Sequence, residues 1–195
     1  MIIDRDLLKN ISGCDFYDGS LIHSRFAYKF FRERVARIGN IITFRSPMEV
    51  TANLVDLEDA LNKDYIYSDD AINFCMEIPD IDLFGGICFQ RLFNSHLATL
   101  LADQYLKRPV SVDGDDIMIP IDNMDPKKAS VSIAKRTNDA VLIHTGINIK
   151  AGDKAPDFAF STELSDEQAQ EFMKKGCEIF YTLAHDIFAS SAKVI

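Results

Sequence analysis

The chain has 195 residues, of which 47% are hydrophobic and 26% are charged, and its formal net charge is −9. This length and composition suit one globular domain, so we expect a single domain over residues 1–195. The negative charge repels phosphate backbones and therefore argues against nucleic acid as a partner.

Neither a disulfide framework nor a membrane span is predicted. The four cysteines, Cys14, Cys75, Cys88 and Cys177, form no CxxC pair and are typical of free thiols in a reducing compartment. The first residues, MIIDRDLLKNISG, carry charges where a signal peptide needs a continuous apolar core. No uncharged apolar stretch has the length that a membrane span needs. We therefore expect a cytoplasmic protein with no membrane partner.

The predicted elements follow from apolar periodicity and from glycine and proline stops. Residues 1–15 suggest short strands or coil. The elements after them, in chain order, are a helix over 22–37, a strand over 40–45, a mainly irregular segment over 46–64 with a short helix in LVDLEDAL, a strand over 72–78, a long helix over 82–107, strands over 115–121, 129–136 and 140–149, and a helix over 165–189. This order predicts an α+β fold with a mostly antiparallel or mixed sheet packed by helices.

The segment KKASVSIAKRTNDAVLIHTGINI, residues 127–149, is the strongest functional lead. A three-residue loop at 137–139 would pair Arg136 with Ala140, and therefore Ser132 with His144. Directly opposed residues share a face, whereas a two-residue loop would mix the faces. The polar face of this hairpin would then carry Lys128, Ser130, Ser132, His144, Gly146 and Asn148.

That face offers an ammonium, hydroxyls, an imidazole, an amide and a glycine that permits close approach to the backbone. These groups suit an anionic small molecule such as a carboxylate or phosphate. The alternative is a polar sheet surface that faces water and has no function.

The hairpin resembles the active-site hairpin of biotin and lipoate protein ligases. HTGINI (144–149) is similar to the GIGINV strand of biotin ligases, and KKASVS (127–132) to their Lys-x-x-Gly strand. The acidic turn DGDD (113–116) resembles the N-D-I segment of lipoate ligases. Ser24 and Arg25 stand in the place of the ligases' Ser-Thr-Asn segment.

Nearly the whole chain also resembles a prokaryotic family, the domain of unknown function numbered 366. The shared marks are FRSPMEV (44–50), VDLED (55–59), IYSDD (66–70), QRL (90–92) and the SVSIA hairpin. This resemblance implies a biotin/lipoate protein ligase-like fold.

The sequence departs from the ligases where they bind adenylate. The segment SPMEVTANLVDLEDALNKDYIYS (46–68) has no glycine and several carboxylates, whereas the ligases have a loop rich in glycine and arginine. ATP or adenylate therefore stays open as a cofactor. Val131 replaces the glycine of the Lys-x-x-Gly motif, and the next cysteine, Cys177, lies in the last predicted helix, so no nucleophile for acyl transfer is evident.

The resemblance assigns roles to individual residues. Lys128 would neutralise a carboxylate or oxyanion, and His144 would act as a general base. The candidate substrate-binding residues are Ser24, Arg25, Arg45, Arg91, Ser130, Ser132, Gly146 and Asn148. For Arg91 we expect a buried anion anchor, with a solvated helix edge as the alternative.

The resulting hypothesis is a small-molecule-binding ligase or transferase that acts on an anionic substrate. Its alternative is a non-catalytic module that binds a metabolite or a protein. No metal site is predicted, because the histidines lack ligand spacing and the acidic segment 56–70 is typical of a solvated loop. A homodimer stays open.

Overall fold

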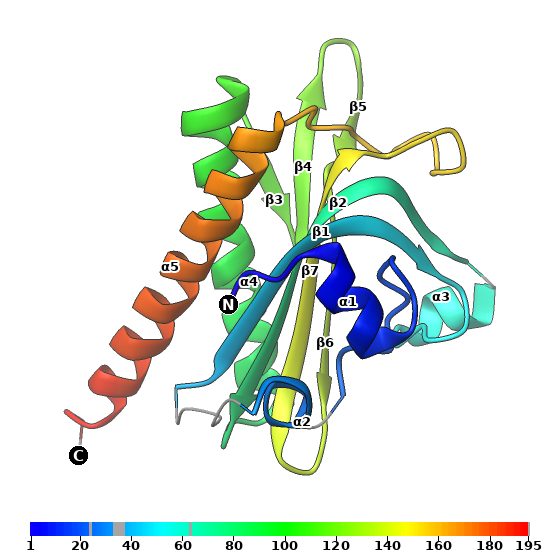
Figure 1. Ribbon diagram of the computed structural model, residues 1–195. Helices are drawn as coiled ribbons and strands as arrows, with labels where there is room; N and C mark the ends of the chain where they lie inside the picture. The colour runs from blue at the N-terminus through cyan, green and yellow to red at the C-terminus, as the bar shows by residue number, and fades with distance from the viewer. Residues whose placement is uncertain (24, 33–37, 63, 195) are drawn as a thin grey trace.

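The computed structural model describes residues 1–23, 25–32, 38–62 and 64–194. Its elements are α1 (Arg5–Ser12), α2 (Phe26–Phe31), β1 (Asn40–Val50), α3 (Leu57–Asn62), β2 (Ile66–Pro79), α4 (Leu83–Leu100), the π-helix η1 (Leu101–Leu106), β3 (Ser111–Asp113), β4 (Asp116–Ile121), β5 (Met124–Lys128), β6 (Ser130–Arg136), β7 (Ala140–Lys150) and α5 (Asp166–Ser191). The fold is α+β, as predicted (Figure 1).

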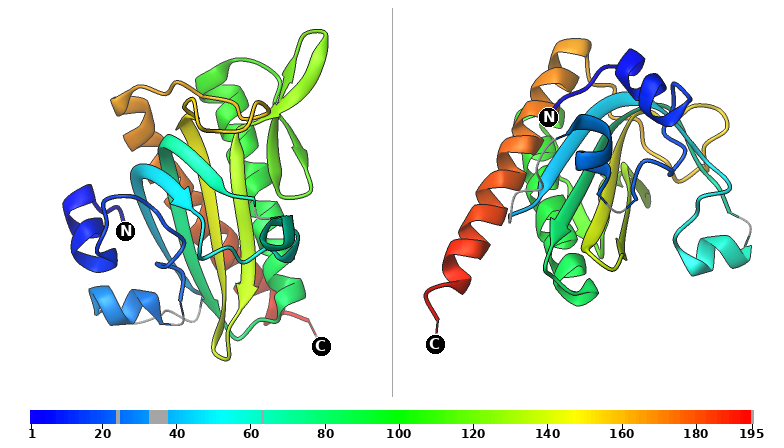
Figure 2. Two further views of the ribbon diagram at one scale, coloured as in Figure 1. Left: turned by 90° about the vertical axis from the view of Figure 1, so that its right-hand side faces the viewer. Right: turned by 60° about the horizontal axis from the view of Figure 1, so that its bottom comes forward.

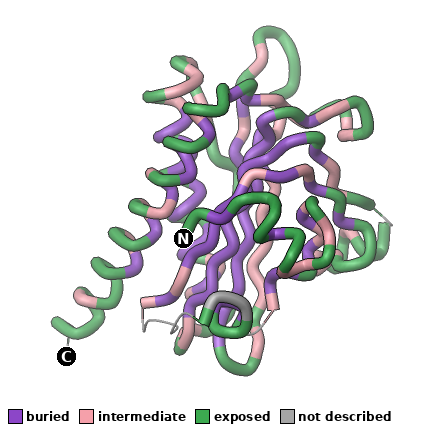
Figure 3. Tube along the Cα trace, viewed as in Figure 1, coloured by how far each residue is buried: buried purple, intermediate pink, exposed green. Residues whose placement is uncertain are grey.

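A four-stranded sheet in the order β1-β2-β7-β6 forms the centre, and every neighbouring pair in it is antiparallel. A smaller sheet of β3, β4 and β5 adjoins it. Ala129 lies between β5 and β6, and its amide donates to the carbonyl of Ile117 in β4. The central strands are buried along most of their length (Figure 3), so both faces of the sheet need a cover.

Helices α4 and α5 cover one face, which we call the helix face (Figures 1 and 2). Phe74 of β2 contacts Phe93 of α4 edge-on, with ring centroids 5.6 Å apart, and also contacts Phe172 of α5. Asp82 caps the start of α4, and Ser165 and Gln168 form the predicted capping box of α5. These caps fix where both helices begin over the sheet.

The N-terminal segment covers part of the other face, which we call the cavity face. Tyr17 extends alongside β1, because its amide donates to the carbonyl of Pro47 and its carbonyl accepts from the amide of Glu49. Phe26 of α2 and Phe44 of β1 are fully buried there. Glu77, also buried, accepts the amide of Arg25 at 2.6 Å and so anchors the start of α2. The segment thus supplies a second hydrophobic core.

Several predicted elements differ from the structure. The strand predicted over 72–78 begins at Ile66, the long helix ends in the π-helix η1, and the short strands β3 and β5 were not predicted. Residues 1–15 include a helix, α1, which Asp4 caps and Gly13 ends in a left-handed conformation. The helix predicted over 22–37 is only α2, Phe26–Phe31; residues 33–37 and Ser24 lie outside the described residues. The first strand extends past Pro47 to Val50, because a register shift there lets the strand continue.

The predicted hairpin register is wrong by one residue. Thr137 pairs with Ala140, so the turn has two central residues. The hydroxyl of Thr137 accepts a hydrogen bond from the amide of Ala140 at 3.2 Å. Ser132 therefore faces Thr145 instead of His144, which faces Ile133. Ser130 and Ser132 lie on the helix face, whereas His144, Gly146 and Asn148 lie on the cavity face. The single polar face does not exist.

No helix among the described residues is long and apolar enough to cross a membrane. All four cysteines, which the structure describes, are free.

The two adjacent glycines of α4 predict opposite responses to alanine. A Cβ at Gly86 would clash with Val141 of β7, whereas at Gly85 the nearest atom would be the Asp82 carboxylate at 3.2 Å. We expect Gly86→Ala to lower the free energy of unfolding by about 1–3 kcal/mol through overpacking. Gly85→Ala should leave it unchanged or raise it by up to about 1 kcal/mol through helix propensity. Urea unfolding of both variants tests this; equal effects would show that α4 does not touch β7 at Gly86.

Candidate functional site

Two adjoining cavities open on the cavity face, beneath the segment that joins β1 to β2. The first, which we call the His144 cavity, has a volume of about 310 Å³. It is lined by Tyr17, Gly19, Ile22, Val50, Asn53, Leu54, Val55, Asp56, Glu58, Asp59, Ile66, Asp115, Asp116, Lys128, Val131, Ser132, Ile133 and His144.

The second, which we call the Asn148 cavity, has a volume of about 330 Å³. It is lined by Met48, Asp59, Asp64, Tyr65, Ile66, Tyr67, Lys128, Ser130, Val131, Asn148, Pro156, Phe158 and Ala159. The two cavities share Asp59, Ile66, Lys128 and Val131. They therefore meet beside Lys128.

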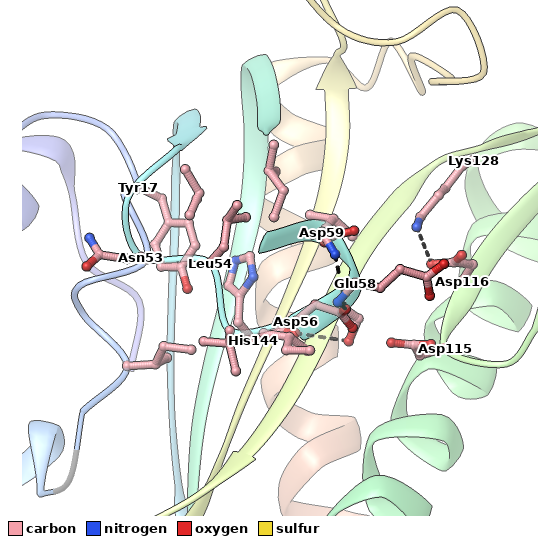
Figure 4. A pocket seen from close by; sticks show the side chains of 18 residues that line it. Tyr17, Asn53, Leu54, Asp56, Glu58, Asp59, Asp115, Asp116, Lys128 and His144 are labelled. Carbon is pink, nitrogen blue, oxygen red and sulfur yellow. Dashed lines mark hydrogen bonds and ion pairs between the residues drawn. The ribbon is translucent and has the colours of Figure 1, made fainter. Parts of the chain in front are cut away.

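Lys128 is the only lysine or arginine among the described residues that line either cavity. Its ammonium lies 2.8 Å from the carboxylate of Asp116 in β4 (Figure 4). Burial raises the pKa of Asp116, and the ion pair with Lys128 opposes that rise. Lys128 is thus held by a carboxylate at the end of β5, where an incoming anion would compete with Asp116.

Apart from Lys128, the charged side chains that line the His144 cavity are all carboxylates. Asp56 accepts the amides of Glu58 and Asp59 and so orders the first turn of α3. Burial raises the pKa of Asp59, and the negative charges of Asp56 and Asp64 raise it further. No group of three or more histidine, cysteine or acidic side chains among the described residues is arranged to hold a metal ion.

His144 lies at the sheet end of its cavity and is buried. Its Nε2 is 2.9 Å from Oδ1 of Asn73, whose Nδ2 donates to Oγ of Ser46 at 3.3 Å. Nε2 therefore carries the proton, and Nδ1 is left as an acceptor. The ring stacks on Tyr17 with centroids 4.0 Å apart. Burial lowers the pKa of His144 to about 3.

This environment corrects the expected role of His144 as a general base with a pKa near neutrality. An imidazole that desolvation keeps neutral is a poor proton acceptor at neutral pH. His144 can instead accept a hydrogen bond from a ligand.

The structure brings several of the predicted residues to the cavities but changes what they can do. Lys128, Ser130 and Asn148 line the Asn148 cavity, and Lys128, Ser132 and His144 line the other. The hydroxyl of Ser130 accepts the amide of Ile117 at 2.8 Å. The hydroxyl of Ser132 is bound to the amide group of Gln90 in α4 at 2.8 Å. Both hydroxyls are thus engaged in hydrogen bonds on the helix face.

Gly146 does not leave its backbone open to a ligand. A Cβ at this position would lie 2.7 Å from the sulfur of Met48 and 3.2 Å from Val131. The glycine therefore permits close packing of β1 and β6 side chains over β7, which corrects its expected role in substrate approach.

The predicted arginines lie outside the lining of both cavities. Arg45 forms ion pairs of 2.6 Å with Asp70 and Asp166, which tie β1 to β2 and to the start of α5. Arg25 lies 3.4 Å from Asp139 in the hairpin turn. Arg91 is exposed, 3.9 Å from Asp115, so the solvated helix edge is correct and the buried anchor is wrong.

The sequence patterns did not indicate that Tyr17 and residues of α3 line the His144 cavity. Tyr17 lies in a segment without periodicity, and only its place beside β1 brings it over His144. The carboxylates of α3 were visible as VDLED, but the sequence could not show that this segment folds back over the sheet.

Comparisons with known proteins agree with this architecture. A family model described as "Domain of unknown function (DUF366)" matches residues 10–195. The structure is similar to that of a "Protein of Unknown Function from Pyrococcus horikoshi", with 27% identity, a TM-score of 0.79 and 92% of each chain covered. A search of curated proteins finds no significant match.

Two further solved structures share the fold at low identity. LipL1 of P. falciparum, in complex with lipoate, is 12% identical with a TM-score of 0.52, covering 92% of this chain and 59% of that one. A mutant biotin protein ligase from Aquifex aeolicus, in complex with biotin, is 11% identical with a TM-score of 0.52, covering 80% and 66%. The fold is therefore biotin/lipoate ligase-like.

Burial of neutral His144 predicts a pH-dependent stability. Its pKa is about 3 in the folded chain and about 6.5 when unfolded, so on acidification only the unfolded chain gains this proton. The stabilisation is complete above about pH 6.5 and is lost as the pH falls, by at most about 1.4 kcal/mol per pH unit. Urea unfolding between pH 7 and 5 should show this slope.

The matched controls are two histidine variants. His144→Gln should flatten the slope, whereas replacing exposed His96 in the same way should leave it unchanged. An identical slope in His144→Gln and the unsubstituted protein would contradict the assignment.

Proposed function

This chain belongs to the family described as domain of unknown function (DUF366), and we propose that it is a small-molecule-binding protein that holds an organic acid at Lys128. The observation that carries the proposal is the meeting of two cavities beside one ammonium group. A cation placed where ligand-sized cavities converge is suited to neutralise a carboxylate.

The body of the acid fits the Asn148 cavity. Apolar and aromatic side chains predominate in its lining, among them Met48, Ile66, Tyr67 and Phe158. Asn148, only 7% exposed, adds an amide group on the cavity face of β7. An acid with an apolar body would bury that body against these side chains and direct its carboxylate to Lys128, displacing Asp116.

The ligands of the structural neighbours are consistent with this class. LipL1 was solved with lipoate and the biotin ligase with biotin, and both ligands are carboxylic acids with an apolar body. At 11–12% identity this likeness supports a shared fold, so the organic acid is our proposal for the present chain.

Ligation or acyl transfer on that acid is the second candidate function. The shared fold and Lys128 favour it. The connection between β1 and β2 does not fit an adenylate, because it supplies Asp56, Glu58 and Asp59 where phosphates would need donors. A binding module without catalysis is therefore the form of the proposal that the local chemistry supports best.

Replacement of Lys128 tests the anchor. We expect Lys128→Met to keep the packing of the stem and to weaken binding of lipoate or octanoate by about 10–100-fold, the loss of a charge-assisted hydrogen bond. Lys127→Met is the matched control, since the neighbouring lysine lines neither cavity. Isothermal titration calorimetry gives both affinities, and equal binding by the two variants would remove Lys128 from the site.

Pyrophosphate exchange separates binding from ligation. With ATP, magnesium and the same acids, we expect no acid-dependent exchange of pyrophosphate into ATP, because carboxylates occupy the place of a phosphate-binding loop. Acid-dependent exchange that is lost in Lys128→Met would establish the ligase instead.

A further inference from the structure

We propose that the His144 cavity, which adjoins the organic-acid site and shares Asp59 and Lys128 with it, binds a small organic cation: an amine with an apolar or aromatic body. The inference goes beyond the proposed organic-acid site, because it concerns the other cavity and a ligand of opposite charge. It stands on the charge of the lining, on the unpartnered polar groups of two buried side chains that line the cavity, and on the apolar surface between them.

The charge of the lining favours a cation. Lys128 and Asp116 form an ion pair and compensate each other. Asp56, Glu58 and Asp59 remain around the same cavity, while Asp115 at its edge lies 3.9 Å from Arg91. Figure 4 shows Asp56 and Asp59 between His144 at one end and Lys128 with Asp116 at the other. An ammonium between them would relieve the repulsion between these carboxylates.

Asp59 is a half-buried carboxylate without a direct partner among the described residues, whereas Glu58 is exposed. Asp56 accepts backbone amides of α3, and Asp115 accepts the side chain of Gln90 at 3.0 Å. No hydrogen bond or ion pair joins the side chain of Asp59 to another described residue. Burial and the charge of Asp56 raise its pKa, while the charge of Lys128 lowers it; a cationic ligand would add to the effect of Lys128 and favour the charged form.

A second observation, independent of the acidic residues, also points to a ligand. Tyr17 is 3% exposed and lines the cavity, and its hydroxyl hydrogen-bonds to no residue in the described part of the chain. Beside it, His144 uses Nε2 for Asn73 and presents Nδ1 without a partner among the same residues. Polar groups of buried side chains usually have a hydrogen-bond partner, so a hydroxyl and an acceptor that both open into one cavity are suited to ligand donors or acceptors.

The space between these polar ends is apolar. Ile22, Leu54, Val131 and Ile133 line it together with the ring of Tyr17. An aromatic body would bury its surface there, with its ammonium directed to Asp56 and Asp59. An acid in the same position would bring a carboxylate against carboxylates.

Three probes with the same ring and different head groups test the proposal: phenethylamine, 2-phenylethanol and 3-phenylpropionic acid. We expect calorimetry to show the amine binding at least about tenfold more tightly than the alcohol or the acid. Asp59→Asn should weaken the amine about tenfold, the effect of one charge-assisted contact. Asp186→Asn, which removes the same charge from the exposed end of α5, should not. Circular dichroism checks that both variants fold.

Lys128→Met separates this proposal from the organic-acid site, because the two predict opposite signs. Loss of the ammonium frees Asp116, so the amine should bind more tightly, while an acid at Lys128 should bind more weakly. Failure of all three probes to bind, acid binding as tight as that of the amine, or an amine affinity unchanged in Asp59→Asn would each overturn the cation site. None of these outcomes alters the expected loss of lipoate or octanoate binding in Lys128→Met.

Discussion

The register of the β6–β7 hairpin decides which side chains lie on the cavity face of the central sheet. Because both faces of the central sheet are covered, a change of one residue in register exchanges every side chain of β6 between a helical core and a ligand-accessible face. The two-residue turn between Thr137 and Ala140 fixes the observed register. It directs Ser130 and Ser132 to the helix face, and it places Val131 and Ile133 of β6 on the cavity face, where both line the His144 cavity.

His144 shows what a covered sheet imposes on a titratable group. Its imidazole lies between Tyr17 and the strand and is neutral, with its tautomer set by Asn73. In this state it cannot provide a mobile proton at neutral pH, and its Nδ1 is left as a hydrogen-bond acceptor. The same stacking joins the N-terminal segment to β7, so the segment that closes the second core also forms one end of the cavity.

The charges around Lys128 divide the site into two chemical halves. On the side of Asn148 the lining is mainly apolar, and Lys128 is available to an acid that displaces Asp116. On the side of His144 the carboxylates of α3 outweigh the same ammonium. Both halves depend on the connection between β1 and β2, since it carries Asp56 and Asp59 over the sheet. The ligand preferences that we propose therefore rest on a loop placed on a shared type of scaffold, a common division of labour.

Local sequence signals determined most of the elements. Alternation along β2, β6 and β7, the cap at Ser165 and the apolar period of α4 and α5 follow from residues close together in the chain, and the motifs around Lys128 and His144 indicated the fold.

Only the tertiary structure decided which face of the sheet each side chain of the hairpin occupies. Whether the turn has two or three central residues depends on hydrogen bonds of Thr137, and both lengths suit the same sequence. Other contacts join residues far apart in the chain. They include the stacking of Tyr17 on His144, the ion pairs of Arg45, and the packing of Met48 against Gly146. Such contacts leave no periodic pattern, because they arise from packing between elements and not from the conformation of any one of them.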